Sequence, residues 1–242
     1  MYFTSFPDHS RADFDERLHF SRFGKANIIF NAQSSNAGCN DHVGCLSIKT
    51  VLNGEEWYGI NGRKVAVRPG QFLVLNNGQS YSCRIAGGTV RSASVFFAHD
   101  FAKAVLRDSL QSEQDLIDNP FHDGDSAPEF YQRLHGFEGN ISQNLLGLIH
   151  SLQENGYDSD RVDEQLSALL GDLIRIHRND VAASKNLHAL KSSTQKEIFK
   201  RVCIARDMIQ TAYREEVSLK LLGRSRVCRL HNSFASSRQR SA

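Results

Sequence analysis

The chain has 242 residues, which is enough for one large domain or for a large domain followed by a small one. Its five cysteines form no C-x-x-C pair, and this odd number without paired spacing excludes a disulfide framework and a zinc finger. No apolar run approaches the roughly 18 residues of a membrane span, and the N-terminus lacks the apolar run of a signal peptide. We therefore expect a cytoplasmic protein with no membrane partner.

The formal net charge of +2 conceals two regions of opposite charge. Residues 183–242 hold 13 Lys or Arg against 4 Asp or Glu, a net charge of +9. Residues 1–182 hold the remaining 16 basic and 23 acidic residues, a net charge of −7. Because Lys and Arg release counterions when they neutralise phosphates, a basic end on an acidic body favours DNA as a partner. The alternative is a solvated basic tail.

Short segments rich in β-branched and aromatic residues fill the first hundred positions. They span residues 26–30, 43–52, 55–60, 64–67, 71–75, 80–85 and 92–97. Asn-Gly pairs at residues 53–54, 61–62 and 77–78 favour the positive φ of type I′ turns between antiparallel strands. The pattern predicts consecutive hairpins in an all-β sandwich or small barrel.

Alternation along these strands places polar and aromatic side chains toward the predicted interior. Ser47 and Lys49 share one face of their strand, and Tyr81 offers an aromatic ring with a hydroxyl. Trp57, the only tryptophan, can stack on a ring or a sugar. These four residues are our candidates for binding a small effector. The alternative is that the aromatic ones fill the core.

Two amphipathic helices are predicted after the strand region. Residues 141–153 and 162–177 carry apolar side chains at helical spacing, and Gly156 supplies a stop between them. They predict an antiparallel hairpin over residues 139–180, followed by a linker over residues 181–192. The hairpin has apolar surface to spare, and one interpretation is that it covers the open side of the strands.

A third helix is predicted from Thr194, which forms a capping box with Glu197. Its apolar residues recur at helical spacing and are Ile198, Val202, Ala205, Met208 or Ile209, and Tyr213. Ser218 fits the N-cap of a second, shorter helix. This pair of helices is typical of the opening of a helix-turn-helix unit, and the alternative is a helical hairpin packed on the rest of the protein.

The stretch from Ser193 to Leu222 resembles the start of the DNA-binding domain of AraC-type transcriptional regulators. The matching residues are Ala205, Arg206, Ile209, Tyr213, Glu216, Ser218, Leu219 and Leu222. Residues 25–100 resemble the cupin-like sensor domain of the same family, chiefly at residues 68–72 and 79–81.

The resemblance implies an α+β fold with three parts. An N-terminal antiparallel, cupin-like β barrel over residues 1–138 is the sensor domain, the helical hairpin follows, and residues 193–242 form a partial helix-turn-helix domain. The implied function is a ligand-responsive regulator that binds DNA and a small effector and forms a homodimer. The resemblance also implies that the helical hairpin is the dimer interface, which is the alternative to a cover over the strands. Phe3 and Phe6 of the N-terminal arm are candidates for a lid over the effector. The candidates for DNA binding are Ser218, Lys220, Arg224, Arg226 and Arg229.

A cupin fold also raises a metal-dependent enzyme as an alternative, because such enzymes cluster histidines on inward strand positions. The strand region contains only His42 and His99, without an H-x-H pair, and residues 71–73 are Gln, Phe and Leu where a histidine is expected. No nucleophile elbow, phosphate-binding glycine loop or H-E-x-x-H motif is present. We predict no catalytic residue, no metal and no cofactor, and therefore not an enzyme.

The match to the family is lost at Gly223, where alanine is usual, and the 49 residues after Ser193 are too few for the family's complete DNA-binding domain. We therefore hypothesise a frameshift or truncation near codon 223. The genetic code permits a shifted reading frame to encode the expected recognition helix over residues 230–236. The alternative function is an effector-binding or dimerising sensor that has lost sequence-specific DNA binding.

Overall fold

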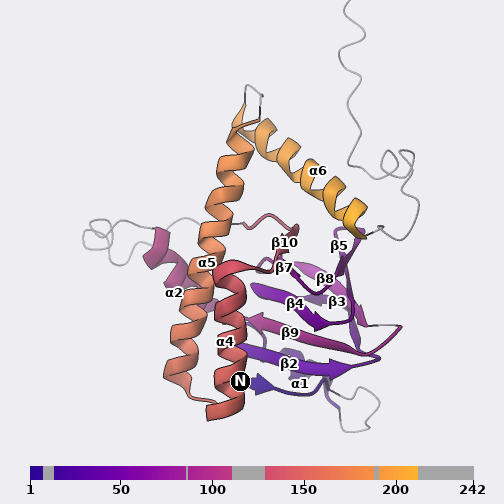
Figure 1. Cartoon of the computed structure of the whole chain (residues 1–242), viewed down its shortest axis with the longest axis vertical. Coiled ribbons are helices and arrows are strands. Elements are labelled where there is room, and N and C mark those ends of the chain that lie inside the picture. Colours follow the sequence, from indigo (N-terminus) through magenta and orange to yellow (C-terminus); the bar gives the residue numbers. More distant parts are fainter. Residues whose placement is uncertain (8–13, 86, 111–128, 188–190, 212–242) are drawn as a thin grey trace, which may run out of the picture.

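The computed structural model describes residues 1–7, 14–85, 87–110, 129–187 and 191–211. Within these ranges the fold is α+β, as expected, and it consists of two β-sheets and a layer of helices (Figure 1). No helix among the described residues is long and apolar enough to cross a membrane.

The first sheet has six strands in the order β1-β2-β9-β4-β7-β10. Their bounds are β1 Tyr2–Phe3, β2 Ile28–Ser34, β9 Val90–Phe96, β4 Ser47–Asn53, β7 Gln71–Leu75 and β10 Leu134–Gly136. β1 runs parallel to β2, and the other described neighbours in this sheet are antiparallel.

The second sheet has four antiparallel strands in the order β3-β8-β5-β6. Their bounds are β3 Gly38–Val43, β8 Ser80–Ile85, β5 Glu56–Ile60 and β6 Arg63–Val67. Asn61 and Gly62 join β5 to β6 with φ of 51° and 75°, as the Asn-Gly signal predicted. The hairpins predicted at residues 53–54 and 77–78 are wrong, because these turns lead from a strand of the first sheet to a strand of the second, β4 to β5 and β7 to β8.

The two sheets face each other as a sandwich, one of the two architectures that the strand pattern predicted, and the described strands do not close into a barrel. Among the described strands, none belongs to both sheets. Val51 and Leu73 of the first sheet pack against Tyr58, Val65 and other inward residues of the second. Side-chain packing, rather than a continuous ladder of backbone hydrogen bonds, therefore holds the sheets together.

Alternation along β4 assigns its side chains to two different interiors. Leu46, just before the strand, and Ile48 join the cluster under the helices, whereas Val51 joins the cluster between the sheets. Lys49 has the parity of Val51, so its side chain lies between the sheets.

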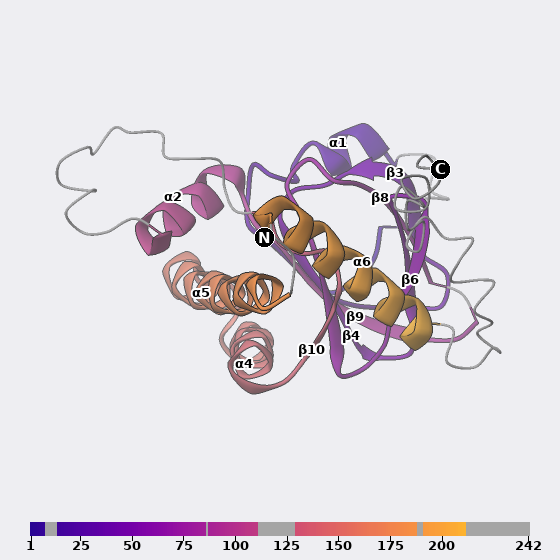
Figure 2. The ribbon, with the colours of Figure 1, turned by 90° about the horizontal axis from the view of Figure 1, so that it is seen from above.

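The helices α2 (His99–Leu110), α4 (Gly139–Asn155) and α5 (Ser159–Lys185) lie on one side of the strands (Figure 2). The predicted hairpin is thus present, and the apolar faces of α4 and α5 are buried against the first sheet, as one of the two alternatives expected. The linker was expected to start at residue 181, but α5 continues to Lys185. In this extra turn the buried Asp180 is paired with Arg133, and the buried Ser184 hydroxyl donates to the Val181 carbonyl at 2.8 Å.

Helix α6 (Ser192–Thr211) begins two residues before the predicted cap. Thr194 therefore lies inside the first turn, and the Gln195 N–H donates to the Lys191 carbonyl at 3.0 Å, so the predicted capping box is wrong. The helix crosses from the end of α5 to β6 (Figures 1 and 2).

The face of α6 that contacts the rest of the protein is not the predicted apolar stripe. Ile198, Val202 and Ile209 are 38%, 57% and 49% exposed, whereas Cys203 and Asp207 are buried. Polar contacts with β6 and with Leu134, the first residue of β10, account for this orientation.

Candidate effector-binding cavity

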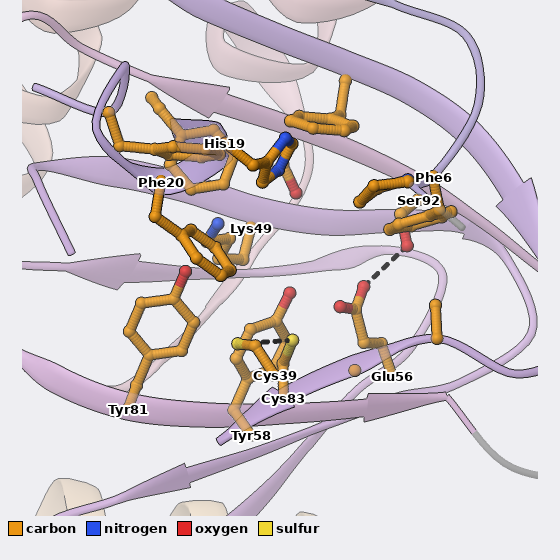
Figure 3. A pocket seen from close by; sticks show the side chains of 17 residues that line it. Phe6, His19, Phe20, Cys39, Lys49, Glu56, Tyr58, Tyr81, Cys83 and Ser92 are labelled. Atoms are coloured by element: carbon orange, nitrogen blue, oxygen red, sulfur yellow. Dashed lines mark hydrogen bonds between the residues drawn. The ribbon is translucent and has the colours of Figure 1, made fainter. Parts of the chain in front are cut away.

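A cavity opens between the two sheets, beside the N-terminal segment and the short helix α1 (Glu16–Phe20) (Figure 3). Its inner volume is about 80 Å³, which is room for several water molecules or a small organic group, and its open side lets a larger ligand extend toward solvent. Strands β2, β4 and β9 of the first sheet and β3, β5 and β8 of the second contribute side chains to its walls.

Aromatic rings form much of the wall. They belong to Phe6, Phe20, Phe23, Phe30, Tyr58, Tyr81 and Phe96. Phe23 and Phe96 meet edge to face with ring centroids 4.6 Å apart, and Phe3 stacks on Phe30 at 5.0 Å. Because these rings support one another, the cavity has a rigid, apolar wall suited to an apolar or aromatic ligand.

Lys49 carries the positive charge of this cavity. Its residue is 3% exposed, and its Nζ lies 3.2 Å from the centroid of the Phe96 ring and 5.4 Å from that of Tyr81. Among the described carboxylates, none forms an ion pair with this ammonium. Burial lowers the pKa of Lys49 to about 8, so the side chain is still mainly protonated at pH 7.

Glu56 faces the same cavity and forms no ion pair with Lys49. It is 4% exposed, and its Oε2 accepts a hydrogen bond from the Ser92 hydroxyl at 2.6 Å. Burial raises the pKa of Glu56, which favours the uncharged carboxylic acid. Burial also raises the pKa of Tyr58 and Tyr81 well above its usual value, so both phenols stay neutral. The arrangement favours binding of an anion next to Lys49.

Two thiols line the wall that the second sheet forms. Cys39 of β3 and Cys83 of β8 are directly paired across the strands, and their sulfur atoms are 3.2 Å apart (Figure 3). Both are half-buried, whereas Cys45 and Cys203 are buried elsewhere as free thiols.

The structure brings two of the four effector candidates into the cavity. Lys49 and Tyr81 line it. Ser47 is buried on the same face of β4, with a hydroxyl that has no hydrogen-bond partner among the described residues, but it does not line the cavity. Trp57 lies between two inward residues of β5 and faces away. Of the lid candidates, Phe6 lines the cavity and Phe3 lies behind it against Phe30.

Sequence reasoning missed Glu56, Tyr58 and the two thiols. The alternation of β5 could have identified the first two, because Glu56 and Tyr58 lie on the face of the strand opposite to Trp57. Trp57 was a candidate only because it is the single tryptophan. The thiols needed the register of β3 with β8, which no local pattern specifies. Among the described residues, no group of three His, Cys, Asp or Glu is arranged to hold a metal ion.

The contact between α6 and the sheets is polar. Asp207 is fully buried, and one of its carboxylate oxygens accepts from the Leu134 N–H at 3.0 Å and from Arg63 of β6 at 3.3 Å. Arg68, after β6, donates to the carbonyls of Gln210 and Thr211 at 2.8 and 3.2 Å. These bonds tie the last turns of α6 to β6. The five candidates for DNA binding, Ser218, Lys220, Arg224, Arg226 and Arg229, lie outside the described residues.

No protein-family model and no curated protein matches the chain. Among solved structures, it is similar to ToxT from Vibrio cholerae O395 bound to (E)-4-(8-methylnaphthalen-1-yl)but-3-enoic acid, with 10% identity and a TM-score of 0.41, over 83% of this chain and 75% of that one. It is similar to unsaturated fatty acid bound wild-type ToxT from Vibrio cholerae strain SCE256, with 11% identity and a TM-score of 0.37, over 82% and 84% of the chains. It is also similar to the AraC-like transcriptional activator CuxR, with 15% identity and a TM-score of 0.34, over 76% and 56%.

Proposed function

We propose that this protein is a ligand-responsive, DNA-binding transcriptional regulator of AraC type. Residues 1–138 bind a small effector between the two sheets, and residues 193–242 bind DNA. The AraC-like pattern from Ala205 to Leu222 and the net charge of +9 over residues 183–242 support the DNA-binding role. The cavity supports the sensing role.

The observation that carries the sensing role is the buried ammonium of Lys49. An ammonium without a paired carboxylate loses most of its hydration in such a place, which costs several kcal/mol. A core position would hold an apolar residue of the same size at no such cost. The position is explained if an anion enters and pairs with Lys49 while its apolar part contacts the phenylalanine rings. We therefore propose a small aromatic or apolar carboxylate as the class of effector.

Titration with 2-naphthoate and with the uncharged 2-naphthamide tests this assignment. The two probes share one ring system, so the difference between their dissociation constants reports the charge. We expect naphthoate to bind at least about tenfold more tightly than the amide, and we expect Lys49→Met to remove that difference. Equal binding of both probes to the unaltered protein, or no binding of either, contradicts the assignment.

A route from the cavity to α6 runs through two neighbouring strands. Glu56 and Tyr58 face the cavity from β5, and their partners in the ladder are Val67 and Val65 of β6. β6 also contacts α6 through Arg63 and through the Ala66 N–H, which donates to the Thr211 hydroxyl at 3.3 Å. We propose that effector binding changes the preferred position of α6 on β6 and thereby the affinity for DNA.

Footprinting of the whole chain on candidate operator DNA tests the DNA-binding role. Protection of one discrete site supports a sequence-specific regulator. Weak binding spread over all sequences and lost in about 200 mM salt supports the alternative function, a sensor without specific DNA recognition. The observation that supports this alternative is the loss of the family pattern from Gly223 onward.

A further inference from the structure

The two thiols in the cavity wall are already placed for a covalent bond. Cys39 and Cys83 are directly opposite each other on adjacent antiparallel strands, with their sulfur atoms 3.2 Å apart. Directly opposite residues in such strands have Cα atoms roughly 4.5–5.5 Å apart, which is within the range that a disulfide spans. A bond between them therefore needs only a small movement of the two side chains.

The surroundings of the pair favour reaction with a small oxidant. Both sulfurs line the cavity beside α1, so a molecule of peroxide size reaches them by the route that an effector takes. The hydrogen bond from Cys83 lowers the pKa of Cys39, and the nearby Lys49 ammonium acts in the same direction, while burial opposes both. The pKa of Cys83 is raised, first by its hydrogen bond with Cys39. Cys39 is therefore the attacking thiolate, and Cys83 is the resolving thiol.

We propose that Cys39 and Cys83 form a reversible oxidation site in the wall of the cavity, which hydrogen peroxide converts to a disulfide. The Cys39 thiolate attacks one peroxide oxygen, so that an S–O bond forms, the O–O bond breaks and hydroxide leaves to become water. Cys83 then attacks the Cys39 sulfur, the S–S bond forms, and the second hydroxide takes the Cys83 proton and leaves as water. The two thiols lose two electrons, and one peroxide gains them. A dithiol reductant reverses the change.

The consequence for the cavity is electrostatic and mechanical. A disulfide cannot ionise. Once the bond has formed, no thiolate competes with an anionic ligand for the Lys49 ammonium. It also ties the edge strand β3 to β8 next to the register shift between Cys39 and His42. The oxidised cavity thus has one wall fixed covalently.

Peptide mapping of the whole reduced chain, treated with hydrogen peroxide at pH 7 and then alkylated, tests the proposal. We expect a cross-linked pair of peptides containing Cys39 and Cys83, alkylation of the other three of the five cysteines, and recovery of all five after reduction. Cys45→Ser and Cys203→Ser are matched controls that should keep the cross-link. In Cys83→Ser, oxidation should stop at a sulfenic acid on Cys39 that dimedone traps.

The rate of cross-linking provides a second measurement. Lys49→Met removes the ammonium that favours the Cys39 thiolate, so the rate at pH 7 should fall about threefold or more, and its pH profile should move to higher pH. A cross-link that involves a different cysteine pair, or no cross-link in the unaltered protein at tenfold excess of peroxide, overturns the proposal. Because the measurement follows a bond and needs neither effector nor DNA, its result is separate from that of the proposed function.

Discussion

At the scale of single residues, Lys49 links the sequence to the chemistry of the cavity. It lies on a strand whose other inward residue near the centre is Val51, so local packing gives no reason for a charge there. The pKa of Lys49 is lowered from 10.5 to about 8 by burial, which means that the folded protein favours the neutral amine more than the unfolded chain does. The contribution of Lys49 to the free energy of unfolding is therefore most favourable above pH 10.5, where the amine is neutral in both states. This contribution is lost as the pH falls to the folded-state pKa of about 8.

Lys49→Met should consequently stabilise the effector-free protein at pH 7. A pKa displaced by this amount corresponds to a cost on the order of 3 kcal/mol, which an apolar side chain of similar length removes. Urea unfolding at pH 7 measures the gain, and the gain should shrink above pH 10. Lys64→Met on the exposed side of β6 is the matched control and should change the free energy of unfolding by less than about 0.5 kcal/mol. A Lys49→Met protein less stable than the unaltered one would show that Lys49 stabilises the fold.

Binding of 2-naphthoate should depend on pH through the same group. The carboxylate is ionised throughout the range, whereas Lys49 binds it only as the ammonium. Affinity is therefore full below the pKa of about 8 in the free protein and falls by about tenfold for each pH unit above it. Calorimetric titration between pH 6.5 and 9.5 measures this slope. A flat profile would mean that the anion binds without Lys49.

At the scale of elements, the orientation of α6 depends on one buried carboxylate. Asp207 combines a backbone donor from Leu134 with the guanidinium groups of Arg63 and Arg206. Burial raises its pKa, while these donors oppose that effect. The helix presents a polar residue to the sheets and leaves Val202 and Ile209 exposed, because Asp207 finds its hydrogen-bond partners only on that side.

Asp207→Ala should release the C-terminal half of α6 from β6. Loss of one partner leaves the Arg63 guanidinium half-buried without its carboxylate, at a cost of about 3 kcal/mol. Hydrogen exchange should become faster at the amides of α6 but stay unchanged at those of β4 and β9. The control is Arg201→Ala, which breaks an exposed pair with Glu197 within the helix and should cost only about 0.3–0.5 kcal/mol. Unchanged exchange in α6 would contradict the assigned role of Asp207.

The elements themselves followed well from local patterns. The Asn-Gly pair at residues 61–62 produced its hairpin, and the apolar spacing of residues 141–153 and 162–177 produced α4 and α5. The start of α6 did not follow, because Lys191 supplies the carbonyl that begins the helix and Thr194 is then an interior residue. Helix ends depend on backbone partners on both sides of the boundary, which a capping motif describes only in part.

At the scale of the whole molecule, the basic end and the acidic body should act separately. Changing Arg224, Arg226 and Arg229 together to glutamine should weaken DNA binding and reduce the slope of the logarithm of affinity against the logarithm of salt concentration by up to about 3. Affinity for 2-naphthoate should stay unchanged, since the cavity residues lie between Phe6 and Phe96. Filter binding at several salt concentrations measures the slope, with Lys64→Gln as the control. Unchanged DNA affinity would favour the solvated tail.

The sequence by itself determined the α+β class, the hairpin at residues 61–62 and the two long helices, because these depend on spacing within a few residues. It also determined the charge division and the AraC-like pattern of the third helix. Only the tertiary structure decided that the strands form two open sheets, that α6 contacts them through Asp207, and that Lys49, Glu56, Cys39 and Cys83 share one cavity. The physical reason is that a strand has two faces and several partners: register and the pairing of distant strands decide which side chains meet, and both are set by the packing of the whole core.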